Sequence, residues 1–400
     1  MKHISADWIF TSAGEPLKNG ILAVSEDGTI LDIIDPDKGY APESEHYEGF
    51  ICPGFVNAHC HLELSHMKGK IEKGLGLDAF IRSIEKQRKA EYAESDLAMQ
   101  DAVHEMITNG IVAVGDISNG ARSFSLKTGT SMRFHTFIEI FAFDAARAES
   151  AFERGRKLHD DLNCIMESRS PQTRQKVSLT LHAPYSASEK LMRMTAEHAS
   201  AHGMVLSVHN QESEDENLLY LWKQGKLIGR LSDFGIDLSA WQAPGMSSLQ
   251  FLMQFMPENV ALQLVHNTVT TKEEIQLAHS MHPGIRWCFC PNANLYIEKR
   301  LPDFDAFLNA GACITLGTDS LASNDRLCIL EEMKTIAQAK PDYDLNMLIG
   351  WATRNGAELL GFLETLGTLE PGKKPGLVHI RQVDRIQKKL TPRSVASRII

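Results

Sequence analysis

The stretch "FVNAHCHLELSH", from Phe55 to His66, carries three histidines and a glutamate directly behind an apolar run. An apolar run of this kind is typical of a buried strand. Residues i and i+2 of a strand point to the same side, so His59 and His61 would present two imidazoles together. Two such nitrogens on one rigid element form half of a site for Zn²⁺ or a similar ion. Taken alone, the pair also fits ordinary surface or core histidines.

Seven further β-like runs follow, separated by helix-like segments. The runs are "GIVAVGDI", "RFHTFIEIFAF", "VSLTLHAP", "MVLSVHN", "VALQLVHN", "IRWCFCPN" and "ACITLGTD". The helical segments include "LDAFIRSIEKQRKAEY", "SDLAMQDAVHEMITNG", "SEKLMRMTAEHASAHG" and "TKEEIQLAHSM", several of which stop at Gly. Eight strand–helix units predict an α/β protein with a (β/α)8 TIM barrel. A doubly wound open sheet is the competing topology, but no G-x-G-x-x-G follows the early strands.

The two ends of the chain differ from this middle part. "WIFTSAG", "GILAVSEDGTILDII" and "HYEGFICPG" near the start, and "LVHIRQV" and "SRII" near the end, have the spacing of short strands. We expect residues 1–52 and 366–400 to form one small β-sandwich-like domain. The barrel would then occupy residues 53–365.

Composition narrows the class of protein. The 400 residues include 41 Lys+Arg against 51 Asp+Glu, a net charge of −10 that disfavours nucleic acid and anionic membranes as partners. No apolar run approaches the ~20 residues that a membrane span needs. The start, "MKHISADWIF", has no secretory signal pattern, and the seven cysteines include no C-x-x-C pair. These features predict a cytoplasmic protein.

Four of the other strand-like runs also finish in side chains that bind metals or transfer protons. These residues are His182, His209, His266 and Asp319, and Glu212 follows His209 by three positions. Any one of them fits a helix cap or a satisfied polar group. Their common place at strand ends fits an active site better, because barrel enzymes build their sites at the carboxyl ends of the strands.

The full set of motifs resembles the amidohydrolase superfamily, in its deaminase and chlorohydrolase branch. The matching stretches are "PGFVNAHCH", "HAPYS", "HNQE", "LVHN", "CPNANLYI", "GTDS" and the tail "ATRNGAELLGFLETLGTLEPGKKPGLVHI". The resemblance covers nearly the whole chain and implies a homodimer with one divalent ion in each chain. Its implied ligands are His59, His61, His209 and Asp319. Zn²⁺ is the expected ion, and Fe²⁺ or Mn²⁺ also suit nitrogen and carboxylate ligands.

The resemblance also implies roles around the ion. Glu212 would move protons, His266 and Asp319 would contact the bound water, and His182 would face the substrate. Members with two ions carry a lysine at the end of the fourth strand. Here that strand ends in His182, and its lysine, Lys176, lies at the other end, so we expect a mononuclear site.

Hydrolytic deamination of a purine nucleoside or related N-heterocycle follows from these roles. The ion would lower the pKa of its water toward ~7, and Glu212 would carry a proton from that water to a ring nitrogen. The other reading of Glu212 is a solvated acid in the run "ESEDEN". Glu63 and Asn294 are candidates for substrate binding, although Glu63 equally suits a loop carboxylate and Asn294 a loop-ordering amide. We expect His66 at the surface.

Three short strings, "HCHLELS", "GLGLDAFI" and "LVHNT", resemble aminodeoxyfutalosine deaminases, which act in the futalosine route to menaquinone. The alternative is another deaminase of this branch, acting on methylthioadenosine, S-adenosylhomocysteine or guanine. A cyclic-amide hydrolase comes third. A catalytically silent metal-binding homologue comes last, because every expected ligand and proton-handling residue is present.

Overall fold

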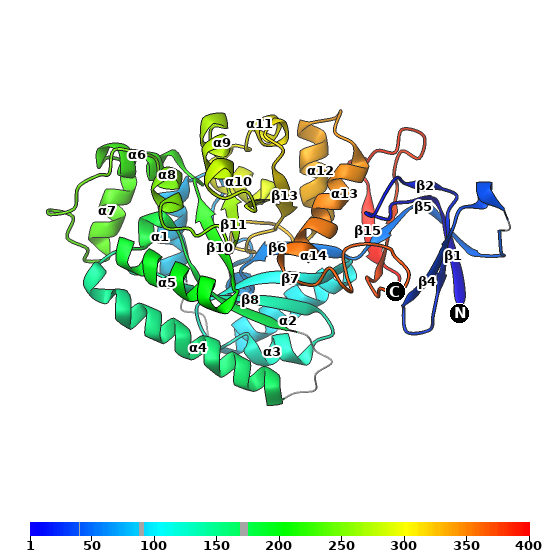
Figure 1. Cartoon of the computed structure of the whole chain (residues 1–400), viewed down its shortest axis with the longest axis horizontal. Helices are drawn as coiled ribbons and strands as arrows, with labels where there is room; N and C mark the ends of the chain where they lie inside the picture. The colour runs from blue at the N-terminus through cyan, green and yellow to red at the C-terminus, as the bar shows by residue number, and fades with distance from the viewer. Residues whose placement is uncertain (40, 88–91, 169–174) are drawn as a thin grey trace.

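Two four-stranded parallel sheets form the centre of the computed structural model, which describes residues 1–39, 41–87, 92–168 and 175–400 (Figure 1). The first contains β6 (Phe55–Cys60), β7 (Ile111–Ser118), β8 (Arg133–Ile140) and β9 (Lys176–Leu181). The second contains β10 (Val205–Asn210), β11 (Ala261–His266), β12 (Arg286–Phe289) and β13 (Cys313–Leu316). Within each sheet the strands pair in chain order. All eight strands expected from the sequence are therefore present.

Helices connect and flank these strands (Figure 1). They are α1 (Leu77–Gln87), α2 (Tyr92–Thr108), α3 (Phe124–Gly129), α4 (Ala148–Ser168), α5 (Glu189–His202), α6 (Glu214–Trp222), α7 (Lys226–Asp233), α8 (Ser248–Met253), α9 (Lys272–Met281), α10 (Pro291–Glu298), α11 (Phe304–Asn309), α12 (Ile329–Ala339), α13 (Leu345–Ala352) and α14 (Arg354–Leu359). The caps explain the bounds of α5, which begins after Ser188 and ends at Gly203, whose φ is +61°. The helix expected over residues 77–92 contains α1 and also residues 88–91, which lie outside the described part.

The two sheets meet at both pairs of edges. On one side the carbonyl of His59 accepts hydrogen bonds from the amides of Thr318 (3.0 Å) and Asp319 (3.1 Å). On the other side the Thr180 hydroxyl in β9 bonds to both the amide and the carbonyl of Ser207 in β10, each at 2.9 Å. Because β6 lies beside β13 and β9 beside β10, the carboxyl ends of neighbouring strands come together.

Strands from both chain ends share a separate seven-stranded sheet. Its order is β15 (Val395–Arg398), β14 (Leu377–Arg381), β5 (Glu45–Pro53), β1 (Lys2–Ile9), β3 (Ile21–Val24) and β4 (Ile30–Ile34), and β2 (Leu17–Lys18) pairs with β1. Both termini lie beside this sheet at one end of the molecule (Figure 1). The expected pairing of the chain ends is thus observed, whereas the sandwich form and the domain limits stay predictions.

A second apolar cluster lies beside the main core and holds α1, α6 and α7. It contains Leu77 and Phe80 of α1, Leu219 of α6, and Leu227 and Leu231 of α7, all buried. The same cluster includes residues that follow the carboxyl ends of strands, among them Ala183 and Ala322. These three helices therefore pack on the side of the molecule where the strands end.

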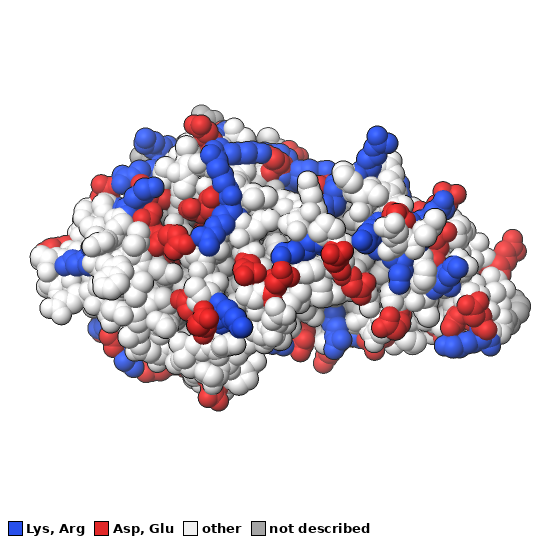
Figure 2. Space-filling view, turned by 90° about the horizontal axis from the view of Figure 1, so that it is seen from above, with Lys and Arg blue, Asp and Glu red and all other residues white. Residues whose placement is uncertain are grey.

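Charged side chains of both signs are interspersed over the face in Figure 2. Among the described residues, no helix combines the length and apolar character required to cross a lipid bilayer.

Candidate metal centre and active site

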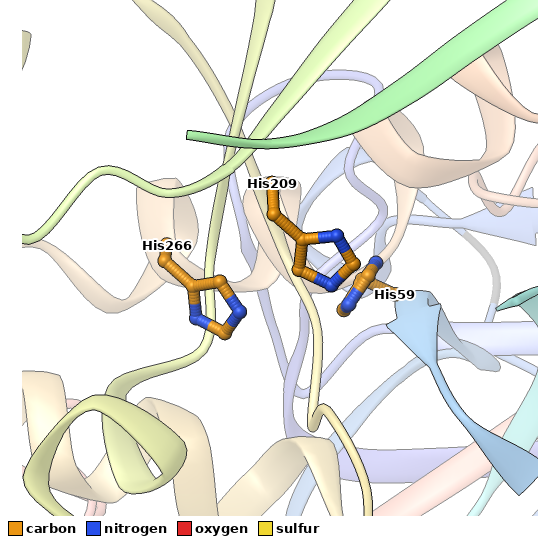
Figure 3. Close-up of side chains that lie close together, drawn as sticks. All are labelled: His59, His209 and His266. Carbon is orange, nitrogen blue, oxygen red and sulfur yellow. The ribbon is translucent and has the colours of Figure 1, made fainter. Parts of the chain in front are cut away.

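Three imidazoles and one carboxylate converge where β6, β10 and β13 end. The Nε2 atom of His61 lies 3.1 Å from Nε2 of His59 and 3.2 Å from Nε2 of His209. Oδ1 of Asp319 lies 3.4 Å from Nε2 of His61 and 3.7 Å from Nε2 of His59. Figure 3 shows the rings of His59 and His209 close together, with His266 beside them. The four expected ligands are therefore brought to one point.

The donor atoms fit a divalent ion. Nδ1 of His209 lies 2.9 Å from the carbonyl of His182, so Nδ1 carries the proton and Nε2 presents a lone pair. Burial lowers the pKa of His59 well below its usual value and lowers the pKa of His209 to about 3. Neutral rings whose lone pairs converge repel one another unless a cation lies between them. Ligands held tetrahedrally ~2.0–2.1 Å from zinc lie about 3.3–3.4 Å apart, close to the observed spacings.

Unusual backbone geometry sets these side chains in place. His266 and Asp319 have φ values of +75° and +55°, in the left-handed region that residues other than glycine rarely occupy. The hydroxyl of Ser323 donates to Oδ2 of Asp319, which leaves Oδ1 directed at the imidazoles. Gly317 lies so close to β6 that a Cβ atom there would be 2.8 Å from Cβ of His59. Glycine is needed here for close approach.

Glu212 is a buried acid beside this centre. Its Oε1 atom lies 3.8 Å from Nε2 of His266. Burial, followed by the charge of Asp319, raises the pKa of Glu212 well above its usual value. The carboxylate of Glu216 holds the backbone in place by accepting from the amides of Glu212 (2.7 Å) and Gln211 (3.1 Å). A buried carboxyl group with a raised pKa, lying beside an imidazole, suits general acid–base chemistry, unlike the solvated acid of the alternative reading.

A cavity of about 360 Å³ opens beside the four expected ligands. Its polar residues near the ligands are His61, Asn119, Glu139 and His182. Its walls are mostly apolar and come from α1, α7 and the segments after β6 and β8; they include Leu64, Ile81, Ile84, Phe141, Phe143, Leu227, Leu231, Phe234 and Ile236. A cavity of this size and lining is typical of small-molecule sites. His182 lines this cavity, and its contact with a substrate stays a prediction.

The other two substrate-binding candidates lie elsewhere. Glu63 is not among the residues that line the cavity, and its carboxylate accepts from the amide of Asn119 (3.1 Å) and the hydroxyl of Ser123 (3.3 Å). Asn294 is fully buried, with Oδ1 2.9 Å from Nδ1 of His266. Substrate contact by either residue stays a prediction. The expectation for His66 was wrong, because it is only 8% exposed, packed among buried residues of the segment after β6.

Sequence reasoning passed over two acidic residues at strand ends. Glu139, near the end of β8, lines the cavity, and Oε1 lies 3.6 Å from Nδ1 of His209. Asp116, in β7, accepts from the amide of Leu62 at 2.8 Å and pairs with the buried Lys127 at 2.5 Å, which fixes the backbone after His61. Both acids lie inside apolar runs, so the signal that found the histidines, a polar residue that ends such a run, does not mark them.

Comparison with known proteins agrees with this arrangement. A family model described as the amidohydrolase family matches residues 50–397. A 5-methylthioadenosine/S-adenosylhomocysteine deaminase of Natronomonas pharaonis is 25% identical over 390 residues, covering 93% of this chain and 81% of that protein. An aminodeoxyfutalosine deaminase of Deinococcus radiodurans is 24% identical over 370 residues, covering 90% and 85%.

A solved structure shares the fold. The crystal structure of Helicobacter pylori aminofutalosine deaminase in complex with methylthio-coformycin matches with a TM-score of 0.79 at 21% identity, over 100% of both chains. The match of the family model to most of the sequence and the deaminase names of the relatives agree with the resemblance seen in the motifs. The chain belongs to the amidohydrolase family and is a hydrolase that acts on carbon–nitrogen bonds.

Proposed function

We propose that this protein is a metal-dependent deaminase that replaces the exocyclic amino group of a 6-aminopurine nucleoside with oxygen and releases ammonia. One observation carries the proposal: the buried Glu212 lies beside a cluster of three imidazoles and a carboxylate that opens onto a cavity. We further propose that the eight strands form one closed barrel and that its ion is zinc, bound by His59, His61, His209 and Asp319.

Different residues of the site carry out different steps of the hydrolysis. A divalent ion in this cluster supplies the acidity that lets a water molecule act as a nucleophile at neutral pH. Glu212 accepts a proton from that water and passes it to the ring nitrogen next to the amino group, so no negative charge builds up on the ring. His266, with Nε2 3.8 Å from Glu212, and Asp319 hold the attacking oxygen and help transfer a second proton to the departing ammonia.

The cavity favours a nucleoside with an extended 5′ substituent over a bare base. Its apolar walls continue between α1 and α7, beyond the polar residues near the ligands. Relatives named aminodeoxyfutalosine deaminase support aminodeoxyfutalosine as the substrate, which would place the enzyme in menaquinone biosynthesis. Relatives named 5-methylthioadenosine/S-adenosylhomocysteine deaminase support those two nucleosides as the second candidates. A cytoplasmic location and a homodimer, both expected from the sequence, are part of the same proposal.

The test is ammonia release by the zinc-loaded protein. The substrates are aminodeoxyfutalosine, adenosine, methylthioadenosine, S-adenosylhomocysteine, guanine and cytosine. The proposal expects the highest kcat/KM for aminodeoxyfutalosine and no turnover of cytosine. Preference for methylthioadenosine or S-adenosylhomocysteine would keep the chemistry and replace the substrate. No ammonia from any nucleoside, with metal bound, would contradict the proposed function.

A further inference from the structure

The carboxylate of Glu139 lies in the substrate cavity, close to the metal ligands but outside their set. Its side chain lines the cavity together with Asn119 and His182 and is 7% exposed. The amide nitrogen of Asn119 donates to Oε2 at 2.8 Å, and Oε1 lies 3.6 Å from Nδ1 of His209. The proton on Nδ1 of His209 already goes to the carbonyl of His182, at 2.9 Å. Glu139 is therefore not needed to orient the ring of His209, and its place in the cavity requires another explanation.

Glu139 and His182 form a complementary pair on the cavity wall. Their metal-binding atoms and that of His209 lie within 4.8 Å of one another. An ionised carboxylate only accepts hydrogen bonds, whereas an imidazole can donate one. A hydroxyl group both donates and accepts, so neighbouring hydroxyls suit this pair. A second metal ion does not suit it, because Nδ1 of His209 carries a proton.

We infer that Glu139, with His182, binds the ribose hydroxyls of the nucleoside. The inference rests on the proposed function and adds the part of the substrate that this side of the cavity recognises. The nucleobase lies at the metal centre beside Glu212, and the sugar follows it into the cavity. Glu139 accepts from the 2′- and 3′-hydroxyls in two hydrogen bonds, while Asn119 fixes the carboxylate. Glu63, the sequence candidate for this contact, does not line the cavity.

A substrate–variant cycle tests the inference. We would measure kcat and KM of the zinc-loaded wild type, Glu139→Gln and Glu149→Gln with adenosine and with 2′,3′-dideoxyadenosine. A hydrogen bond to a charged group contributes more binding free energy than one to a neutral group. Glu139→Gln should therefore lower kcat/KM for adenosine about 10- to 100-fold, mainly through a higher KM. With the dideoxy substrate, Glu139→Gln should match the wild type. Glu149, an exposed residue paired with Lys190, is the matched control and should change neither substrate.

The outcomes separate the inference from the proposed function. An equal loss on both substrates, or loss of zinc from Glu139→Gln, would assign Glu139 a structural role and overturn the inference alone. The wild type gives a second measure that needs no variant: it should itself prefer adenosine over the dideoxy form by 10-fold or more, and no preference would also overturn the inference. Absence of nucleoside turnover by the wild type would overturn the proposed function together with the inference.

Discussion

The side chain of Asn294 holds His266 by two hydrogen bonds. Its Oδ1 atom lies 2.9 Å from Nδ1 of His266, and its Nδ2 atom donates to the backbone carbonyl of His266 at 3.3 Å. Since a carbonyl can only accept, the second bond fixes which end of the amide faces the ring. Nδ1 of His266 must therefore carry a proton, and Nε2 faces Oε1 of Glu212 at 3.8 Å.

Replacing Asn294 should disturb this arrangement without removing the metal. Asn294→Ala should lower kcat about 10- to 100-fold, because the imidazole loses the partner that fixes its tautomer and orientation. Steady-state kinetics and metal content measured on the same preparation check this. Asn294→Asp keeps an acceptor for Nδ1 and should recover part of the rate. Unchanged kcat in Asn294→Ala would show that His266 needs no such support.

Glu212 should be required for turnover and not for metal binding. Glu212→Gln removes the proton carrier and should lower kcat by at least about 100-fold, with one metal ion retained per chain. Glu214→Gln is the matched control, because Glu214 lies in the same acidic run, is exposed and pairs with Arg300. A near-normal kcat in Glu212→Gln would show that another group carries out the proton transfer.

The strand pattern could be predicted from the sequence because burial on both faces makes the strands of parallel sheets continuous apolar runs. Each of the eight expected runs contains a strand, and α5 and α9 begin and end within a residue or two of their expected bounds. The contact between the two sheets depends on tertiary hydrogen bonds, such as those between Thr180 and Ser207. No local pattern contains that information.

The site was predictable to the extent that its residues occupy strand ends. His59, His61, His209 and Asp319 obey that rule and meet at one point. Asn294 follows a strand end, but its amide contacts His266, and a sequence does not show which atom an amide will reach. His66 was misassigned because the packing of one polar residue depends on neighbours distant in the chain.

Glu332 should make the stability of the fold depend on pH. This buried carboxyl accepts hydrogen bonds from Asn292 and Asn324, and burial raises its pKa from 4.5 to about 8. The folded protein thus keeps a proton that the unfolded chain has lost. The resulting stabilisation is complete below about pH 4.5 and disappears as the pH rises through about 8.

Urea unfolding at pH 5, 7 and 9 measures this effect. The free energy of unfolding of the wild type should fall with pH more steeply than that of Glu332→Gln, which has no proton to lose. Glu331→Gln alters the neighbouring residue, which pairs with Lys334, and should keep the wild-type slope. Parallel slopes for all three proteins would contradict a raised pKa at Glu332.

Metal analysis should find one ion per chain. Nε2 of His61 lies within 3.4 Å of ligand atoms of His59, His209 and Asp319, and Lys176 lies at the opposite end of β9 from this point. Dialysis against dipicolinate should abolish turnover and lower Tm, and zinc should restore both. His209→Asn should bind metal weakly from the outset. Two tightly bound ions per chain would contradict the mononuclear assignment.

Gly317 should be irreplaceable because β6 and the segment after β13 approach too closely there for any side chain. A Cβ atom at this position would lie 2.8 Å from Cβ of His59, 2.9 Å from its carbonyl oxygen and 3.0 Å from Sγ of Cys290. Relief requires the backbone of a metal ligand to move. Gly317→Ala should therefore cost at least ~1–3 kcal/mol of stability and weaken zinc binding together.

Gly350 in α13 provides the control for this substitution. Nothing lies within 4 Å of a Cβ atom there, and Ala favours a helix, so Gly350→Ala should be neutral or stabilise by up to ~1 kcal/mol. Thermal unfolding and zinc titration of both variants measure the two effects. If Gly317→Ala lost stability but bound zinc normally, the close approach would matter for packing alone. Loss of both, with Gly350→Ala unaffected, would tie the geometry of the metal site to the contact between β6 and the chain after β13.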